Sequence, residues 1–325
     1  MSSGKFKVVI TDSYHSKLSF DQAEFEGLDV NLVVEECKNE DEVIEKCWDA
    51  DALMVQHAKI SRKVIQRLEK CRIVARYGVG FDNVDLEAAT EHGIMVANVP
   101  DYCIDEVSSH AIALLMACAR KIVLVNNSVK AGVWTYEVAE PVYRLTGQTL
   151  GIVGLGRIGS AAAKKGLGLG FKVQTYDPYV SETDLDVSFV DFDTLLKTSD
   201  SVSIHTPLTD ETRHMFGESE FKKMKKSAFL INTARGPVVD EVALYEALKN
   251  GEIAGAGLDV TEKEPPDQDN PILKLDNLVI TAHTAWYSDD SRMQLQRETT
   301  RAVAAVLRGG KPRSLVNPDV MNKKR

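Results

Sequence analysis

Three ionisable residues follow strand-like segments in the second half of the chain. Arg235 comes after FLINTA, Glu264 shortly after GLDV, and His283 after LVITA. If these segments form a parallel sheet, the three side chains meet at its carboxyl edge, where ligands bind in open α/β sheets. Together they offer a cation for a carboxylate, a proton donor that works near neutrality, and an acid that orients the donor. This set predicts the reduction of a 2-keto acid, in which hydride reaches C2 and the carbonyl oxygen takes a proton.

Each residue has a distinct predicted role. His283 would donate the proton, and Glu264, hydrogen-bonded to the imidazole, would fix its tautomer and favour its protonated form near pH 7. Arg235 would bind the carboxylate and polarise the ketone, because its planar fork orients a carboxylate better than a lysine can. Taken singly, Arg235 and Glu264 would more often be structural ion-pair residues. Their joint placement favours a site.

His205 is the rival proton donor, since it also ends a strand-like segment. The residues that follow it, Thr206 and Pro207, predict a loop beside a nucleotide. We therefore interpret His205 as part of a cofactor pocket. His110, within a long helical segment, is interpreted as structural.

A glycine motif, GLGRIG, follows the strand-like run Leu150–Val153 and opens a helix that we expect to begin at Ile158. In this setting the pattern is typical of a dinucleotide site. Gly154 permits a tight turn, Gly156 leaves room for the pyrophosphate, and Gly159 lets helix and strand pack closely. The candidate cofactor-binding residues here are Gly154, Gly156, Arg157, Ile158 and Gly159.

The next strand-like run ends at Asp177, eighteen residues beyond Gly159. The carboxylate that binds the adenosine ribose hydroxyls is expected at about 20 residues. Asp177 would repel a 2′-phosphate, and the residues after it, Pro178, Tyr179 and Val180, include no arginine to receive one. The sequence therefore predicts NAD as cofactor, and an NADP-linked reductase is the less favoured alternative.

Alternating strand-like and helical segments must position these residues. In the first hundred residues the strand-like runs are Phe6–Ile10, Val30–Val34, Ala52–Val55, Ile73–Ala75 and Ile94–Ala97. In the second series they are Leu150–Val153, Val173–Tyr176, Ser201–His205, Phe229–Asn232, Gly257–Val260 and Leu278–Thr281. One long helix is expected from Asp105 to about Lys130, and another from Asp289 to Leu307. The pattern predicts an α/β protein with two Rossmann-like or flavodoxin-like, doubly wound parallel-sheet domains and a cleft between them.

Composition narrows the class of protein further. The 325 residues suit two domains. A net charge of −9 argues against a nucleic-acid partner. The five cysteines are odd in number and lack zinc-type spacing, so we expect reduced thiols and no metal. No segment is typical of a signal peptide or a membrane span, which favours a cytoplasmic protein.

The ordered motifs GLGRIG with Asp177, NTARGPVVDEVAL, GAGLDVTEKEP and TAHTAW resemble the D-isomer-specific 2-hydroxyacid dehydrogenases over nearly the whole chain. The resemblance implies a discontinuous substrate-binding domain, residues 1–100 and 289–325, around an NAD-binding Rossmann domain, residues 101–288. It implies NAD-dependent interconversion of a 2-keto acid and its D-2-hydroxy acid. It also implies a homodimer formed through the nucleotide domain, which the helix after Asp105 would suit.

The same resemblance adds site residues. Val79 and Gly80 are similar to the loop that cradles the substrate carboxylate, and Asp259 to the acid that contacts the nicotinamide carboxamide. Further cofactor contacts are implied for Thr206, Thr233 and Ala234.

Within the family, RYGVGFDNVD, the His57 that ends ALMVQH, and HTAWYS resemble the C-terminal binding proteins, which are NADH-responsive corepressors. A corepressor-like interaction protein is therefore the alternative function. Trp286 would crowd the pocket and favour an apolar or aromatic substrate contact, which argues against 3-phosphoglycerate. The substrate side chain is expected near His57, Tyr77, Tyr102 and Trp286.

Overall fold

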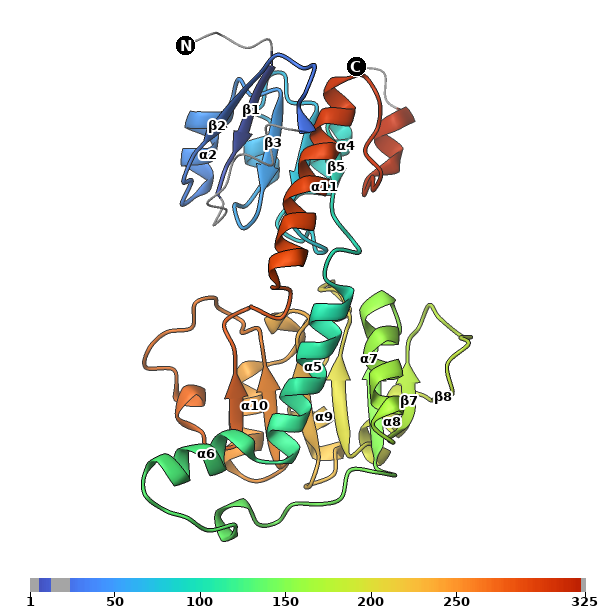
Figure 1. Ribbon diagram of the computed structural model, residues 1–325. Coiled ribbons are helices and arrows are strands. Elements are labelled where there is room, and N and C mark those ends of the chain that lie inside the picture. Colours follow the sequence, from blue (N-terminus) through green and yellow to red (C-terminus); the bar gives the residue numbers. More distant parts are fainter. Residues whose placement is uncertain (1–5, 13–23, 323–325) are drawn as a thin grey trace. The chain divides into compact units, whose positions relative to one another are not determined.

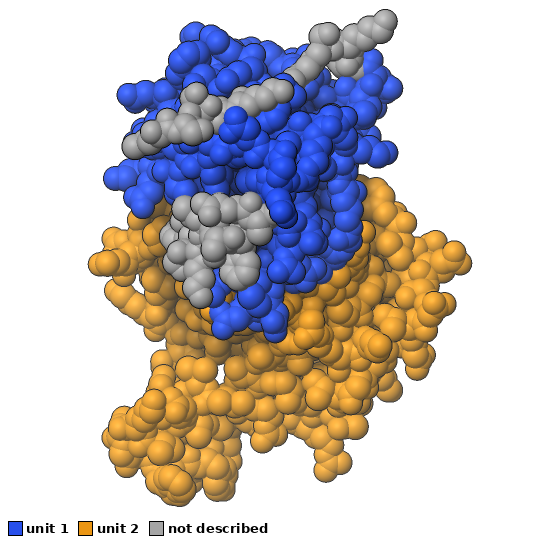
Figure 2. Space-filling view, turned by 45° about the horizontal axis from the view of Figure 1, so that its top comes forward, with its two compact units in different colours: residues 1–102, 288–325 blue, residues 103–287 orange. Residues whose placement is uncertain are grey.

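The computed structural model describes residues 6–12 and 24–322, and the chain divides into two compact units. Unit 1 comprises residues 1–102 and 288–325, and unit 2 comprises residues 103–287. Figure 1 shows the helices and strands of the chain, and Figure 2 shows unit 1 in blue and unit 2 in orange. The outermost residues of the expected first domain, 1–5 and 323–325, lie outside the described part. Each unit contains one parallel sheet, which confirms the predicted α/β class.

Unit 1 contains a five-stranded parallel sheet in the order β2-β1-β3-β4-β5. Its strands are β1 (Phe6–Ile10), β2 (Val30–Val34), β3 (Ala52–Val55), β4 (Ile73–Arg76) and β5 (Met95–Ala97). This is the flavodoxin-like order, whose direction reverses between β1 and β3. That switch point is where a ligand of this unit is expected.

Helices cover both faces of the unit 1 sheet. They are α2 (Glu40–Cys47), α3 (Arg62–Ile65), α4 (Leu86–Glu91), α11 (Asp289–Leu307) and the 3₁₀ helix η4 (Pro318–Asn322). Apolar residues of α2, α3 and α4 share one core with β1, β3, β4 and β5, whereas α11 packs against β3 and β4. Ser288 caps α11 by accepting from the Ser291 amide at 2.9 Å, and the helix has the bounds expected from the sequence.

The end of the chain returns to β5. Leu315 forms an antiparallel bridge with Ala97, and the Val316 amide donates to the Val96 carbonyl at 2.8 Å. The side-chain oxygen of Asn317 in turn accepts from the Val96 amide at 2.8 Å. These bonds satisfy backbone groups at the edge of the sheet.

Unit 2 contains a seven-stranded parallel sheet in the order β12-β11-β10-β9-β6-β7-β8. Its strands are β6 (Thr149–Val153), β7 (Lys172–Tyr176), β8 (Val187–Phe189), β9 (Ser201–Ile204), β10 (Phe229–Asn232), β11 (Gly255–Leu258) and β12 (Leu278–Ile280). This is the Rossmann order with one further strand, and the switch point lies between β6 and β9. The sequence missed β8, and it placed β11 two residues too late because Gly255–Leu258 is rich in glycine and lacks a strand-like pattern.

Helices of unit 2 pack on both faces of this sheet (Figure 1). They are α5 (Ile104–Ala119), α6 (Ile122–Lys130), α7 (Arg157–Gly168), α8 (Phe192–Thr198), α9 (Glu218–Lys223) and α10 (Glu241–Lys249), with 3₁₀ helices η1 (Glu137–Ala139), η2 (Gly236–Val238) and η3 (Pro271–Lys274). Helices α5 and α7 share one core, and α8, α9 and α10 share the other.

The prediction of one helix from Asp105 to Lys130 was wrong. Lys121 adopts a left-handed backbone with φ of 51°, and the chain bends by 59° between α5 and α6. Helix α5 packs against α7 and the sheet, whereas no residue of α6 is buried. The direction of α5 is therefore set by the core, and that of α6 is not. Among the described residues no single helix is long and apolar enough to span a membrane, although the bent pair α5 and α6 meets those criteria by length and composition when taken together.

Candidate active site

The glycine turn after β6 has the tight geometry that the motif predicts. Gly154 has a φ of +91°, and a Cβ there would lie 2.9 Å from the carbonyl oxygen of His205. A Cβ on Gly159 would lie 2.0 Å from the Gly154 oxygen, so α7 can approach the turn only without a side chain. At Gly156 a Cβ would meet nothing within 4 Å, which leaves open space beside the turn.

Helix α7 begins at Arg157, one residue before the expected Ile158. The Ser160 amide is the first to bond within the helix, donating to the Gly156 carbonyl at 2.8 Å. The amides before it have no partner inside the helix and carry the positive end of its dipole. This end of α7 therefore suits a pyrophosphate.

Asp177, directly after β7, is hydrogen-bonded to the glycine turn that follows β6. Its carboxylate accepts from the Leu155 amide at 2.7 Å and from the amides of Tyr179 and Val180 at 2.8 and 3.0 Å. The carboxylate is thus fixed beside the glycine turn, where a ribose diol would bind. Its negative charge at that place opposes a 2′-phosphate.

Two buried hydroxyls that follow the carboxyl ends of β9 and β10 also fit a bound dinucleotide. Among the described residues, the side-chain oxygens of Thr206 and Thr233 are buried without a hydrogen-bond partner. Buried polar groups are normally satisfied, so an orphaned pair at the carboxyl ends of β9 and β10 indicates a missing ligand. Ala234 lies beside them, its amide donating to the Asn232 side chain at 3.0 Å. The residues present fit NAD.

The histidine and glutamate selected from the sequence form a direct pair. His283 Nδ1 lies 2.6 Å from Glu264 Oε2, and Glu264 Oε1 accepts from the Thr261 amide at 3.2 Å. Burial alone would raise the pKa of the Glu264 carboxyl, but the hydrogen bond and charge of His283, with smaller contributions from Thr261 and Arg235, hold that pKa below its usual value. Glu264 therefore stays ionised and accepts a hydrogen bond from Nδ1–H, which leaves Nε2 as the nitrogen that can exchange a proton with a substrate.

Arg235 follows β10 and is only partly exposed. Its carbonyl accepts from the Asn232 side chain at 2.9 Å, and its own Nη1 donates to the Ala234 carbonyl at 2.9 Å. These bonds fix the backbone and one edge of the guanidinium. The guanidinium also contributes to the low pKa of Glu264, so its charge acts at the same site.

The loop that carries His283 is attached to Asp259, which is 1% exposed. The His283 amide donates to the Asp259 carbonyl at 2.8 Å, and the amides of Thr284 and Ala285 donate to its carboxylate at 2.9 and 2.8 Å. His283 itself has a φ of 52°, a left-handed conformation that costs a non-glycine residue about 1–2 kcal/mol. Three consecutive amides bound to one residue offset that strain.

His205 differs from His283 in its surroundings. Its Nε2 lies 2.9 Å from the Ser203 hydroxyl, and burial lowers the pKa of the ring to about 4. A histidine with this pKa is neutral at pH 7 and cannot serve there as a proton donor of imidazolium type. The two candidate histidines thus differ: the pKa of His205 is lowered by burial, whereas His283 is paired with the Glu264 carboxylate.

This low pKa predicts a pH dependence of stability. Because the folded pKa is about 4 and the ordinary value is 6.5, the unfolded chain binds the proton more tightly. His205 thus lowers the free energy of unfolding by about 3 kcal/mol as pH falls from 6.5 to 4. Urea unfolding should show that the free energy of unfolding falls less between pH 6.5 and 4 in His205→Gln than in the parent. Above pH 6.5 the free energy of unfolding should depend on pH in the same way in both proteins. Equal losses in both proteins would show that the ring is not desolvated.

Some of the residues predicted to contact the substrate follow strands of the unit 1 sheet, whereas Arg235 and Trp286 belong to unit 2. His57 is exposed two residues after β3, and Val79 and Gly80 are half-buried after β4. Tyr77 is 2% exposed and donates from its hydroxyl to the Met54 sulfur at 3.8 Å, so it supports this edge from within the core. Trp286, in unit 2, packs edge-on against Tyr287 with ring centroids 5.7 Å apart.

The sequence missed two groups of residues near these strand ends. Asp12, after β1, accepts from the amides of Gln56, His57 and Ala58, with distances of 3.1 Å to Gln56 and 3.0 Å to Ala58. An acid two residues after a strand was the available signal, close to the position of Asp177 after its own strand. The second group links His110 to Thr281, which are 171 positions apart, so no local pattern could reveal it.

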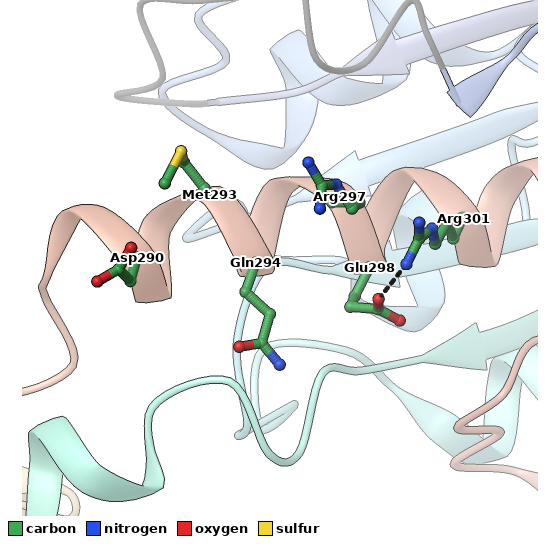
Figure 3. A pocket seen from close by; sticks show the side chains of 6 residues that line it. All are labelled: Asp290, Met293, Gln294, Arg297, Glu298 and Arg301. Atoms are coloured by element: carbon green, nitrogen blue, oxygen red, sulfur yellow. Dashed lines mark hydrogen bonds and ion pairs between the residues drawn. The ribbon is translucent and has the colours of Figure 1, made fainter.

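A pocket on unit 1 contains none of the predicted site residues. Asp290, Met293, Gln294, Arg297, Glu298 and Arg301 of α11 line it (Figure 3). Arg301 is paired with Glu298 and Glu24, and Arg297 is paired with Glu24. The positive charges of the pocket are therefore already balanced by carboxylates of the same unit. Among the described residues, no group of three or more His, Cys, Asp or Glu side chains is placed to hold a metal.

A Rossmann-ordered sheet with this glycine turn, a ribose-directed acid and a histidine–carboxylate pair defines the class of nicotinamide-dependent dehydrogenases. Residues 112–285 match the family described as D-isomer specific 2-hydroxyacid dehydrogenase, NAD binding domain. A glyoxylate reductase of Korarchaeum cryptofilum is 43% identical over 86% of this chain and 86% of the relative. A D-3-phosphoglycerate dehydrogenase of Archaeoglobus fulgidus is 40% identical over 96% of this chain, which spans only 59% of that relative.

Among solved structures, D-lactate dehydrogenase from Aquifex aeolicus, complexed with NAD and lactic acid, is similar over 95% of this chain and 99% of its own. The TM-score is 0.86 at 32% identity. The chain belongs to the D-isomer-specific 2-hydroxyacid dehydrogenase family. It is an NAD(P)-dependent oxidoreductase that interconverts 2-keto and 2-hydroxy acids.

Proposed function

We propose that this protein reduces a small, unphosphorylated 2-keto acid such as glyoxylate with NADH, and that His283 is the general acid. The observation that carries the proposal is the 2.6 Å pair between His283 and Glu264, in the unit that carries the glycine turn. The reverse reaction, oxidation of the D-2-hydroxy acid, uses His283 as the base.

NADH, when bound, supplies the hydride that C2 of the keto acid receives. His283 gives the proton on Nε2 to the carbonyl oxygen, on which negative charge develops. Glu264 keeps its negative charge, holds Nδ1 and stabilises the charged ring. Arg235 binds the substrate carboxylate and draws electron density from the ketone. In the reverse direction Nε2 takes the proton from the hydroxyl.

Two observations favour an unphosphorylated substrate. At the switch point of unit 1, the Asp12 carboxylate is fixed by the amides of residues 56–58, so a phosphate placed there would meet a negative charge. The relative with 43% identity over most of both chains is a glyoxylate reductase. We propose that unit 1 binds the substrate, through His57, Val79 and Gly80, and that unit 2 binds the cofactor.

A panel of keto acids assayed with NADH tests this function. Glyoxylate, hydroxypyruvate and pyruvate should give higher kcat/KM than 3-phosphohydroxypyruvate, because of the Asp12 charge. Higher kcat/KM for phenylpyruvate would instead indicate that Trp286 selects an aromatic substrate. If no keto acid were reduced, the proposed function would be wrong.

The cofactor preference yields a separate prediction for Asp177. Asp177→Ser should weaken NADH binding and raise the kcat/KM for NADPH relative to NADH by about tenfold or more, because the change removes the charge that repels a 2′-phosphate. The comparison requires KM for both cofactors. Asp184→Ser, an acidic-to-serine change outside the glycine turn, is the control. An unchanged NADPH/NADH ratio in Asp177→Ser would contradict the role.

We further propose that the protein is a cytoplasmic homodimer formed through unit 2. Exposed apolar and aromatic side chains gather over α6 and the segment after it: Ile122, Val123, Val133, Trp134 and Tyr136, with Trp134 88% exposed. An apolar patch of this kind is typical of an interface. The relatives reported above are reductases and dehydrogenases, so the predicted C-terminal binding protein branch and its corepressor function are not supported.

The dimer predicts a change of mass in solution. The double variant Ile122→Asp/Trp134→Asp should be a monomer by light scattering, because two buried charges would destabilise the interface. The parent should have twice that mass. Tyr179→Asp, which alters another highly exposed aromatic residue, is the control and should leave the mass unchanged. A monomeric parent would contradict the proposal.

A further inference from the structure

A chain of side chains connects helix α5 to the loop that carries His283. His110 Nε2 lies 2.9 Å from the Thr281 hydroxyl, and that hydroxyl donates to Asp259 Oδ1 at 2.6 Å. Since the single hydroxyl hydrogen of Thr281 points to Asp259, the imidazole must donate to Thr281. This direction selects the Nε2–H tautomer of His110.

The chain ends on the residue that fixes the catalytic loop. Asp259 is 1% exposed, and its carboxylate accepts from the amides of Thr284 and Ala285 as well as from Thr281. Its Oδ1 also lies 3.7 Å from His110 Nε2. A buried carboxylate needs such donors to keep its position. Losing the hydroxyl would leave the carboxylate held by two backbone amides instead of three donors, and so less firmly positioned.

We propose that His110 and Thr281 are positioning residues, which hold Asp259 and, through it, the strained backbone of His283. Helix α5 also contacts β10, β11 and β12, so His110 fixes a helix of the Rossmann core to the ends of the catalytic strands. The inference rests on the proposed role of His283 as the proton donor. It assigns a function to a histidine that the sequence indicated only as structural.

The test compares variants that remove or keep each hydrogen bond. His110→Leu removes the bond between His110 and Thr281, and Thr281→Val removes that bond and the one to Asp259, whereas His110→Gln keeps a donor and Thr281→Ser keeps the hydroxyl. We expect kcat to fall about 10- to 100-fold in the first pair. KM for the keto acid should change less than threefold, because Arg235 is untouched. The second pair should recover most of the lost kcat.

The double variant tests whether the two residues act as one unit. His110→Leu/Thr281→Val should lose no more kcat than the worse single variant, because both changes break the same chain. Multiplied losses would overturn the proposal. His92→Leu is the matched control and should keep parental kcat, since the one side-chain bond of His92 among the described residues is local, to the Ala88 carbonyl of the preceding helix at 2.9 Å.

A readout that needs no activity separates this proposal from the proposed function. Hydrogen exchange of the backbone over residues 281–287 should be faster in His110→Leu and Thr281→Val, and parental in His110→Gln. Parental exchange in all variants would overturn the positioning role, even if the enzyme were active. The converse result is a parent that reduces no keto acid while the variants still show these exchange changes. That result would support the positioning role of His110 and Thr281 and contradict the proposed function.

Discussion

His283→Asn is expected to lower kcat for keto-acid reduction by about 10²- to 10⁴-fold, the range that a positioned general acid supplies. The Nδ1 of His283 is held by Glu264 at 2.6 Å, so the imidazole has one nitrogen left for the substrate. Asparagine can occupy the site but cannot transfer a proton near neutral pH. Steady-state kinetics with NADH should show the loss in kcat, with NADH binding close to that of the parent.

His205→Asn is the matched control for this prediction. Its ring has a pKa of about 4 and is neutral at pH 7, so it should not supply the proton. We expect the loss of kcat to be much smaller than in His283→Asn, with any effect concentrated on KM for NADH. A larger loss of kcat in His205→Asn would reverse the assignment of the two histidines.

Arg235→Met is expected to reduce kcat/KM for the keto acid by about 10²- to 10³-fold. Removing one member of a charge-assisted, bidentate contact typically costs 2–5 kcal/mol or more, and each 1.4 kcal/mol is a factor of ten. Because the guanidinium is already fixed on the Ala234 carbonyl, its orientation toward a carboxylate costs little further order. The loss should appear in both KM and kcat, since Arg235 also polarises the ketone.

Arg235→Lys separates charge from geometry. Lysine keeps the positive charge but cannot form the planar fork, so its kcat/KM should lie between those of the parent and Arg235→Met. An activity equal to that of the parent would show that charge alone suffices. If Arg235→Met itself retained parental kcat/KM, the substrate carboxylate must bind elsewhere.

The sequence predicted a feature correctly where the residues of one short segment are sufficient to cause it. The strands Phe6–Ile10 and Phe229–Asn232 have the bounds expected from their apolar runs. In GLGRIG, the left-handed backbone of Gly154 and the close contact at Gly159 are requirements of a single turn, so spacing alone revealed them. The pairing of His283 with Glu264 was likewise expected from two adjacent strand ends.

Other features depend on contacts between distant segments. The break at Lys121 contains neither glycine nor proline, so the sequence predicted one helix where surroundings divide it into two. Strand β8 is three residues long and is defined by pairing with β7. The branch of the family was also misjudged from short motifs, since whole-chain similarity to reductases outweighs them.

The sequence by itself therefore determined the α/β class, the dinucleotide turn and the chemical set Arg235, Glu264 and His283, because glycine conformations and ionisable side chains at strand ends are local properties. Only the tertiary structure showed that desolvation lowers the pKa of His205, because that shift depends on its surroundings in the folded chain. It also decided what holds the catalytic loop. His110 reaches Asp259 through Thr281 because α5 packs against the sheet, and hydrogen bonds between such distant positions exist only in the folded chain.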